Sequence, residues 1–490
     1  MPEHLRTLVV ILVLSTALFA AAHRPAGGIS LRGDLTRRRN VWFALTLAAF
    51  LSHSFWIYTF LAVPLLIHAS HKESNPPALY FFLLFVLPVA YVRIPGLGLI
   101  NYLFELSHAR MLALLILLPA FFSLPRDRLA FGRTGPDKIF AAYLLLIIVL
   151  QAREATLTSA FRGIFYLFID VFLPYFVISR YLKNIQDFRD TLLSLVLPIL
   201  VLALIAIFEA SRHWLLYQPI LNVLGLEGMT SYLDRGGILR AIGTAGQPIA
   251  LGYLFVIGIG FYLFLQRSIQ HKLIRPLGMA LLALGLIAPL SRGPWVGAAV
   301  LILVFLATGR HAARRMIGLA LAALLVLAVA PLIPGGEKLV NMLPVIGKTE
   351  TANITYREQL ITNSMIVIER NPWLGSVDYL KAPEMQAMRQ GQGIIDIVNS
   401  YIGITLEQGI VGLSLFIGFF VLTLWGIYKA MRLIPDKDSE QRLLGRVLLS
   451  TLLAIMVIIF TVSSITIIPV MYWSVAALGV AYTQMIRKHA

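Results

Sequence analysis

The chain has 490 residues, of which 58% are hydrophobic and only 13% are charged. That charged share is about half of what a soluble domain carries, so a water-soluble globule is excluded. Lys and Arg outnumber Asp and Glu by 41 to 24, which gives a formal net charge of +17, and the sequence has no Cys. The composition therefore excludes disulfides, thiol nucleophiles and Cys-ligated metals, and it indicates a polytopic membrane protein.

Apolar runs long enough to span a bilayer recur along the whole chain. A spanning helix requires about 20 mostly apolar residues to cross roughly 30 Å of hydrocarbon. The candidates lie near residues 5–22, 41–69, 77–91, 101–124, 138–151, 156–179, 190–210, 246–266, 273–290, 294–309, 316–333, 402–428, 447–463 and 467–485. We expect an all-α fold, a polytopic membrane helical bundle of about 12–14 spans with one large loop domain on the outer face.

The first candidate span follows Arg6 and has no small-residue cleavage site, so we predict a retained anchor. Lys and Arg gather in alternate loops from residue 125 onward, which should be cytoplasmic. The loops between them, including 211–245, 291–293 and 334–398, then face outward. The positive charge is thus explained by membrane topology, and no basic stretch is interleaved with stacking aromatics, so nucleic acid is not an expected partner.

One basic run breaks this alternation. Arg32 and Arg37 to Arg39 would fall outside if the first two candidates were single crossings. Either residues 41–69 form two short passes or the N-terminus is external, and the sequence leaves both open. We divide the chain into four regions on this pattern. They are N-terminal transmembrane helices (1–150), a transmembrane core with short outer Arg-bearing loops (151–333), an outer loop domain (334–398) and C-terminal transmembrane helices (399–490).

The outer segment 334–398 is too long for a turn and too apolar for a simple linker, which predicts a small domain or lid. Between Ile354 and Ile368, Ile361 and Met365 complete one apolar stripe at helical spacing. Arg357 lies within that stripe. A charge on a buried face is costly unless it has a partner, so Arg357 either pairs with an acid or points at an anionic ligand.

Arg residues recur at positions predicted to lie near the outer membrane boundary. They are Arg162, Arg235, Arg240, Arg292 and Arg357. An Arg inside the hydrocarbon is expensive, so Arg162 should face protein, water or a ligand. One interpretation is that Arg162 and Asp170, two turns apart on the same helix, each join an internal ion pair. The alternative is that several guanidinium groups surround a phosphorylated lipid headgroup, because Arg matches phosphate oxygens bidentately.

Arg292 is the most informative of the five. The sequence from Ser291 to Pro294 interrupts two apolar runs with almost no room for a solvated loop. Pro294 suits the first turn of the next helix, whose N-terminal amides favour an anion beside Arg292. A structural ion pair is the other interpretation of Arg292.

Few residues are candidates for proton transfer. Asp396 and Glu407 flank Asn399, where a polar outer segment enters a span. Asn399 and Glu407 are about two helical turns apart, so both can face the mouth of one cavity. Glu407 is a candidate base, although it can equally pair with one of the Arg residues, and Glu209 is ambiguous in the same way.

No cofactor or metal is expected. The ten His residues show no pair at ligand spacing on the outer side, and no Gly-Lys-Ser/Thr loop cradles a nucleotide. Any reaction must therefore draw its free energy from an activated substrate.

Several of these motifs resemble those of one family. The runs are Arg240-Ala-Ile-Gly-Thr-Ala-Gly-Gln-Pro, Ser291-Arg292-Gly293, Tyr356-Arg357, Glu369-Arg370-Asn371-Pro372-Trp373-Leu374-Gly375, Val398-Asn399-Ser400-Tyr401 and Leu406-Glu407-Gln408-Gly409-Ile410-Val411-Gly412. Over about residues 160–430 their order resembles the outer loop and following span of the O-antigen ligase and polysaccharide polymerase superfamily.

The resemblance implies a metal-independent glycosyltransferase in the bacterial inner (cytoplasmic) membrane, with its active site facing the periplasm. Its substrates would be an undecaprenyl-diphosphate-linked glycan donor and a glycan acceptor, with membrane lipid around them and a flippase and a chain-length regulator as further partners. Diphosphate-binding Arg residues of the family would correspond to Arg162, Arg240, Arg292 and Arg357.

With the residues above, this gives a predicted site. Arg292, Arg240, Glu407 and Asp396 are the expected catalytic residues, and Arg162, Arg235, Arg357, Asn399 and Tyr401 the expected substrate-binding residues.

One position departs from the family pattern. Lipid A core ligases have a His before the Asn of the loop-end motif, where this chain has Val398. The departure favours a polymerase that joins repeat units during exopolysaccharide or O-antigen synthesis. The alternatives are a ligase that transfers glycan to lipid A core or protein, and a transporter of lipid-linked glycan. Transporters often show two similar halves, and no such repeat is evident in the sequence.

Overall fold

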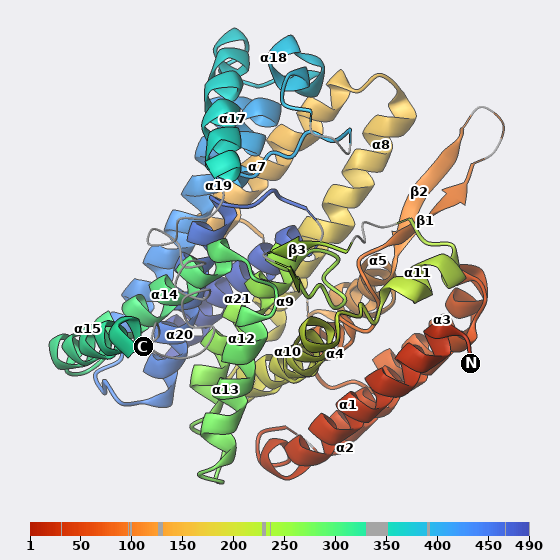
Figure 1. Cartoon of the computed structure of the whole chain (residues 1–490). Helices are drawn as coiled ribbons and strands as arrows, with labels where there is room; N and C mark the ends of the chain where they lie inside the picture. The colour runs from red at the N-terminus through yellow and green to blue at the C-terminus, as the bar shows by residue number, and fades with distance from the viewer. Residues whose placement is uncertain are drawn as a thin grey trace.

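The structure is a computed structural model, and it describes residues 1–30, 32–96, 98, 100–125, 131–227, 232–235, 237–329, 351–389, 393–465 and 467–489. These residues form a helical bundle with two small β-hairpins, so the predicted all-α polytopic membrane fold is confirmed (Figure 1). Within the predicted loop 334–398, residues 334–350 and 390–392 lie outside the described part of the chain.

The helices of the first half are α1 (Glu3–Ala26), α2 (Arg32–Leu51), α3 (Phe55–His71), α4 (Pro76–Leu83), α5 (His108–Leu112), α6 (Leu118–Ser123), α7 (Gly135–Leu150), α8 (Leu157–Tyr166), α9 (Leu173–Tyr181), α10 (Ile185–Arg212) and α11 (Gln218–Leu224). Those of the second half are α12 (Pro248–Leu265), α13 (Ile274–Ile287), α14 (Arg292–Ala307), α15 (Ala312–Val329), α17 (Thr351–Arg370), α18 (Pro383–Gln386), α19 (Ser400–Arg432), α20 (Glu440–Ile459) and α21 (Ile468–His489). Short π or 3-10 turns are η1 (Ala113–Leu117), η2 (Gln151–Arg153), η3 (Leu167–Phe172) and η5 (Tyr379–Lys381). The hairpins are β1 (Tyr91–Pro95) with β2 (Tyr102–Ser107), and β3 (Asp234–Arg235) with β4 (Ile238–Leu239), both antiparallel.

Seven of the described helices are long and apolar enough to cross a membrane. They are Glu3–Ala26, Gly135–Arg153, Leu157–Tyr181, Ile185–Arg212, Pro248–Leu265, Ser400–Arg432 and Glu440–Ile459. α12 is apolar on all sides, and it is almost wholly buried because α10, α13, α14 and α20 surround it. The span predicted near 77–91 is wrong: only α4 is helical there, and the chain then continues into β1.

Residues 41–69, which the sequence left ambiguous, are divided between two helices. α2 ends at Leu51, and Ser54 begins α3 by accepting a hydrogen bond from the backbone N–H of Trp56. The structure thus has two separate helices here, which is what the alternative of two short passes within residues 41–69 required. The basic run at the start of α2 consequently lies at the same end of the bundle as the start of α10.

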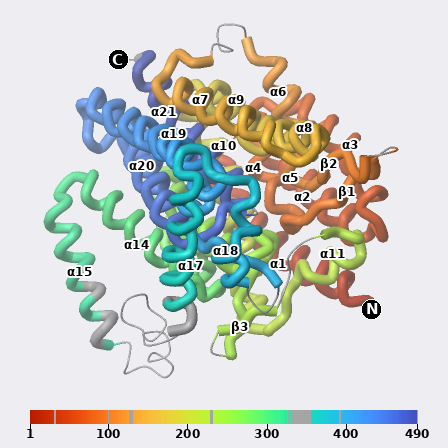
Figure 2. The backbone as a smooth tube through the Cα atoms, turned by 90° about the horizontal axis from the view of Figure 1, so that it is seen from above, coloured from red at the N-terminus to blue at the C-terminus, as the bar shows by residue number. Residues whose placement is uncertain are grey.

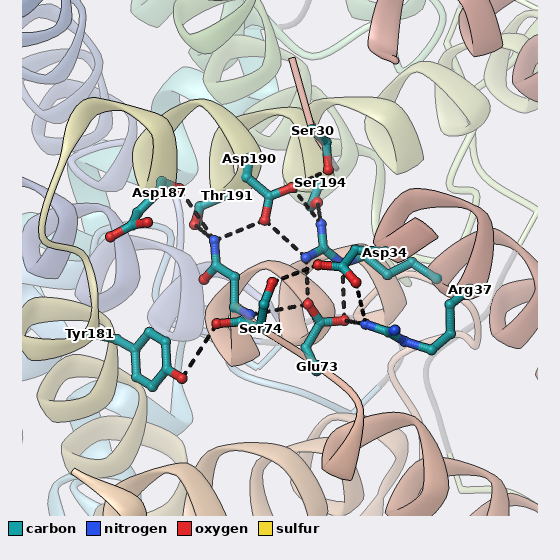
Figure 3. Close-up of polar contacts among 12 residues, drawn as sticks. Ser30, Asp34, Arg37, Glu73, Ser74, Tyr181, Asp187, Asp190, Thr191 and Ser194 are labelled. Carbon is teal, nitrogen blue, oxygen red and sulfur yellow. Dashed lines mark hydrogen bonds and ion pairs between the residues drawn. The ribbon is translucent and has the colours of Figure 1, made fainter. Parts of the chain in front are cut away.

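A buried ion network joins these two helices (Figure 3). Arg38, which is fully buried, bonds Glu73 Oε1 at 2.5 Å and Asp190 Oδ1 at 2.7 Å. Asn75 Nδ2 and Ser30 Oγ donate to Asp190 as well. Such a network is tolerated only because nearly every charge meets an opposite charge or a hydrogen-bond partner. It fixes α2, the α3–α4 connection and α10 relative to one another.

The outer segment forms a small unit above the bundle, with α17 and α18 at the top of Figure 1. α17 buries Leu360, Val367 and Ile368 against Met385 and Leu406. The apolar stripe predicted for this helix is wrong in part, because the side chains of Ile361 and Met365 are about half exposed. The buried face of α17 is the one that carries Leu360, and not the predicted stripe, because α18 and the start of α19 pack against that side.

The start of α19 contains a break where the outer segment docks. Gly409 has a φ of 68° and ψ of −172°, which interrupts the helical hydrogen bonds. The N–H groups of Ile410 and Val411 donate instead to the carbonyl oxygens of Pro372 and Trp373, at 2.8 and 3.2 Å. A Cβ at Gly409 would lie 2.2 Å from the Trp373 oxygen, so only glycine fits this approach. The motif Glu369–Gly375 and the motif Leu406–Gly412, both of which carried the resemblance, are therefore hydrogen-bonded to each other. We call this contact the joint.

Candidate functional site

The turn between α13 and α14 is held by two Arg residues from the β3–β4 hairpin and the residue that follows it. Arg240 Nε donates to the Pro289 carbonyl oxygen at 3.0 Å, and its Nη2 donates to Ser291 Oγ at 2.9 Å. Arg235 Nη1 donates to the Leu290 carbonyl oxygen at 2.5 Å. Leu290 has a φ of 48°, which is strained for a side chain with a Cβ. The two guanidinium groups therefore stabilise a strained turn and are themselves fixed beside it.

This turn places Arg292 at the first position of α14. Ser291, the residue before the helix, does not cap it with its side chain. Its Oγ accepts from Arg240 and donates to the Pro289 carbonyl oxygen instead. Pro294 lies in the first turn, as the sequence predicted. Arg235, Arg240 and Arg292 thus gather at the positive end of one helix dipole.

Gly293 brings this helix start against the turn after α20. A Cβ on Gly293 would lie 2.3 Å from Thr461 Oγ1, so the close packing of the two segments depends on glycine. Arg357 of α17 donates to the Thr461 carbonyl oxygen at 3.4 Å. The outer segment therefore contributes a fourth guanidinium to the same place.

Arg357 is electrostatically coupled to two other predicted site residues. Partial burial lowers the pKa of its guanidinium below the ordinary value; nearby Arg235 lowers it further and Asp396 opposes the shift. Arg357 lies on the face of α17 that carries Leu360. Its guanidinium contacts the backbone carbonyl oxygen of Thr461 and forms no direct ion pair with Asp396. Within the described residues Arg357 makes no direct ion pair, and the anionic ligand that the sequence offered as the alternative stays a prediction.

Asp396 lies at the edge of this cluster. Ser463 Oγ donates to its Oδ1 at 2.5 Å, and Tyr356 Oη donates to its backbone oxygen at 3.0 Å. Ser400 Oγ donates to the Val462 carbonyl oxygen at 2.7 Å, which fixes the same turn to the start of α19. Asp396 is thus the carboxylate that the structure brings to the Arg cluster.

Asn399 and Tyr401 have structural partners. Asn399 Oδ1 accepts from the N–H groups of Tyr401 and Ile402, so it caps α19. Tyr401 Oη donates to the Met456 carbonyl oxygen at 2.8 Å. Both residues lie at the start of α19, close in sequence to Asp396, and their described contacts position that segment.

Glu407 makes its described contacts with residues other than Arg235, Arg240, Arg292 and Arg357, the four residues called here the Arg cluster. Its backbone oxygen accepts from Arg153 Nη2 at 2.9 Å, and the charges that act on its carboxylate are those of Arg153 and Glu154. The neighbouring Leu406 carbonyl oxygen accepts from the N–H of Ser376, and the N–H of Ile410 donates to the Pro372 carbonyl oxygen. Among the two candidate bases, Asp396 is the one beside the Arg residues.

Arg162 contacts β2 and not the turn between α13 and α14. Its Nε and Nη2 donate to the carbonyl oxygens of Leu103 and Tyr102, and its guanidinium lies 3.6 Å from the Tyr102 ring centroid. Asp170 joins an ion pair, as one interpretation expected, and its partner is Arg110 at 2.8 Å. The described polar contacts of Arg162 are with backbone oxygens. Seen from above, β1 and β2 lie toward the edge of the molecule, whereas α17 lies near the middle (Figure 2). The structure does not join Arg162 to the other four Arg residues.

Glu209 is a site component whose role the sequence left ambiguous. It is fully buried at the end of α10, and its Oε1 accepts from the N–H of Leu216 at 3.0 Å. Its Oε2 accepts from the N–H groups of Ile242 and Gly243, each at 3.0 Å. The carboxylate therefore positions the loop that carries Arg240. An acid at the end of an apolar span was the only signal for this role in the sequence.

The arrangement can bind an anion bearing several oxygen atoms, with a carboxylate beside it. Within the described residues, no three His, Asp or Glu side chains come together as metal ligands would.

Comparison with known proteins gives a family match over part of the chain. Residues 277–417 match the family model described as O-Antigen ligase. The matched segment includes α14, α17 and the start of α19, and so Arg292, Arg357 and Asp396. The match over this segment supports membership of the O-antigen ligase and polymerase superfamily, which the motifs indicated. No curated protein matches the chain.

Proposed function

We propose that this protein is a polymerase that joins undecaprenyl-diphosphate-linked oligosaccharide repeat units at the periplasmic face of the inner membrane. The family match supports a ligase or polymerase type of glycosyl transfer. The observation that carries the proposal is the gathering of Arg235, Arg240, Arg292 and Arg357 around the 289–291 turn and Thr461.

The Arg cluster binds the diphosphate of the donor. As the bond between the sugar C1 and the phosphate oxygen breaks, its electron pair passes to that oxygen, and the guanidinium groups stabilise the developing charge. Their hydrogen bonds to backbone oxygens fix their positions before substrate arrives, so little reorganisation is required.

The acceptor hydroxyl attacks C1 from the face opposite the diphosphate. Asp396 is the carboxylate available to take the hydroxyl proton, because it lies beside the Arg cluster and Glu407 does not. The outer segment supplies both Arg357 and Asp396, so its docking on α19 completes the site.

Arg292→Ala tests the proposal. The variant is expected to insert into the membrane at the wild-type level but to lose glycan chain growth by about 100-fold or more, as when a charge-stabilising donor is removed. Membrane fractions would be probed for the protein, and the glycan would be sized on a gel. Normal polymer in the variant would refute the role of the Arg cluster.

A ligase that transfers glycan to lipid A core or protein is the second candidate, and the description of the matching family favours it. Val398, where ligases have His, favours the polymerase. Deletion of the gene distinguishes them. Loss of a polymerase leaves single repeat units on the lipid carrier, whereas loss of a ligase leaves finished polymer on that carrier.

A further inference from the structure

An apolar groove lies among α1, α10, α12 and α13, away from the Arg cluster. Its volume is about 410 Å³, within the range of sites that bind small molecules. Leu18, Leu197, Leu281 and Leu284 are among the residues that line it. The hydroxyl of Tyr262, which also lines it, is bonded to the carbonyl oxygens of Ile274 and Arg275. The wall therefore offers an occupant almost purely apolar surface.

The groove has the length of one lipid leaflet. Its lining on α13 extends from Ile274 to Leu284, which is about 15 Å of helix at 1.5 Å per residue. That is half of the roughly 30 Å hydrocarbon thickness of a bilayer. An acyl chain of a phospholipid fits this length, whereas a polyprenyl chain that began at the Arg cluster would approach from the other end of α13.

One end of the groove is positively charged. A second cavity, of about 580 Å³, shares Ala21, Pro25 and Ile274 with the groove and is lined by Arg24 and Arg39. His23 and His271 also line it, and its lining contains no Asp or Glu. This end of the bundle carries the loops that the Lys and Arg pattern predicts to be cytoplasmic.

We infer that this groove binds an anionic phospholipid of the cytoplasmic leaflet, with an acyl chain between α1 and α13 and the phosphate between Arg24 and Arg39. Charge complementarity selects the headgroup, since basic residues near a membrane surface attract anionic lipids. The site is separate from the proposed diphosphate site and does not depend on it.

The purified full-length protein would be titrated with phosphatidylglycerol and, separately, with phosphatidylcholine, and bound lipid counted by native mass spectrometry. Phosphatidylglycerol is expected to bind roughly tenfold more tightly, and Arg24→Gln with Arg39→Gln should remove most of that difference. Ala21→Trp, which fills the groove where the two cavities meet, should weaken both lipids. Arg432→Gln with Lys437→Gln, exposed basic residues near the end of α19, form the matched control.

Equal binding of the two lipids by wild-type protein would overturn the inference, as would unchanged preference in the Arg24 and Arg39 double variant. Competition by a neutral polyprenol that displaces phosphatidylglycerol would also overturn it, because the groove would then bind the tail of a lipid-linked substrate. Circular dichroism and thermal unfolding of each variant would show that it is folded before lipid is added.

Discussion

The guanidinium of Arg153 donates a hydrogen bond to the backbone oxygen of Glu407 at 2.9 Å. It donates in addition to the carbonyl oxygens of Leu374 and Gly375, each at 2.9 Å. One side chain from the connection between α7 and α8 thus binds both partners of the joint between the outer segment and α19. Because that segment carries Arg357 and Asp396, Arg153 acts on the site through the position of the segment.

Arg153→Ala should therefore loosen the joint without unfolding the bundle. We expect a loss of about 1–2 kcal/mol in stability, because hydrogen bonds from an exposed charged group contribute modestly. Cleavage by a protease near residues 371–376 should become faster, and glycan chain growth should fall. Glu154→Gln, at the neighbouring position, is the control. Wild-type protease resistance in Arg153→Ala would show that the bonds do not hold the segment.

Gly409→Ala should be more damaging than an ordinary change of this size. A backbone with φ of 68° and ψ of −172° is almost limited to glycine and costs about 1–3 kcal/mol for a residue with a Cβ, which would also lie 2.2 Å from the Trp373 oxygen. We expect a total of at least about 2 kcal/mol by thermal unfolding. Gly403→Ala, in the same helix with no atom closer than 3.8 Å, should be neutral or slightly stabilising. Equal unfolding temperatures for the two variants would contradict the described joint.

Arg240→Lys keeps the charge but loses the planar fork that binds Pro289 and Ser291 together. Transfer from a lipid-linked glycan donor should fall by about 100-fold in the purified protein. Arg162→Lys, at the β1–β2 hairpin, should retain most activity because Arg162 does not contact the turn. Equal losses in the two variants would show that Arg162 belongs to the diphosphate site.

Glu209→Gln tests how the Arg240 loop is positioned. The amide would replace one acceptor oxygen with an NH2 group that faces backbone N–H groups. The expected cost is about 1–3 kcal/mol, since a buried donor is left without an acceptor. Activity should fall while the affinity for acceptor glycan is unchanged, because only the diphosphate side moves. A fall in acceptor affinity alone would place Glu209 in a different role.

Arg38→Met should destabilise the bundle by about 3–5 kcal/mol, because Glu73 and Asp190 would remain buried without their main cation. Thermal unfolding in detergent measures the change. Arg39→Met, at a half-buried position whose hydrogen bonds to the described residues go to Asn40, should change stability by less than about 0.5 kcal/mol. Similar stability of the two variants would contradict the network.

Much of the candidate site could be predicted because its chemistry leaves local signals. Arg292 was identified from a polar interruption between two apolar runs, and the structure places it at the first turn of α14. Asp396 and Glu407 could not be separated by sequence, since both flank the entry to α19. Their environments differ because Asp396 lies toward Ser463 and Arg357, whereas Glu407 lies toward Arg153.

The amino-acid sequence is enough to recognise an all-α membrane protein, because a bilayer admits only backbone that satisfies its own hydrogen bonds and spanning helices leave long apolar runs. It also determined which motifs carry the family resemblance. The packing of the helices was needed to show that Arg235, Arg240 and Arg357 lie around the 289–291 turn and Thr461, beside the start of α14 at Arg292, and that Arg162 lies elsewhere. The hydrogen bonds from Arg240 to Pro289 and from Arg357 to Thr461 join residues 49 and 104 positions apart. They depend on helix packing, on the close approaches at Gly293 and Gly409 and on backbone oxygens. Every residue has such an oxygen, so no sequence pattern marks which one an Arg will bind.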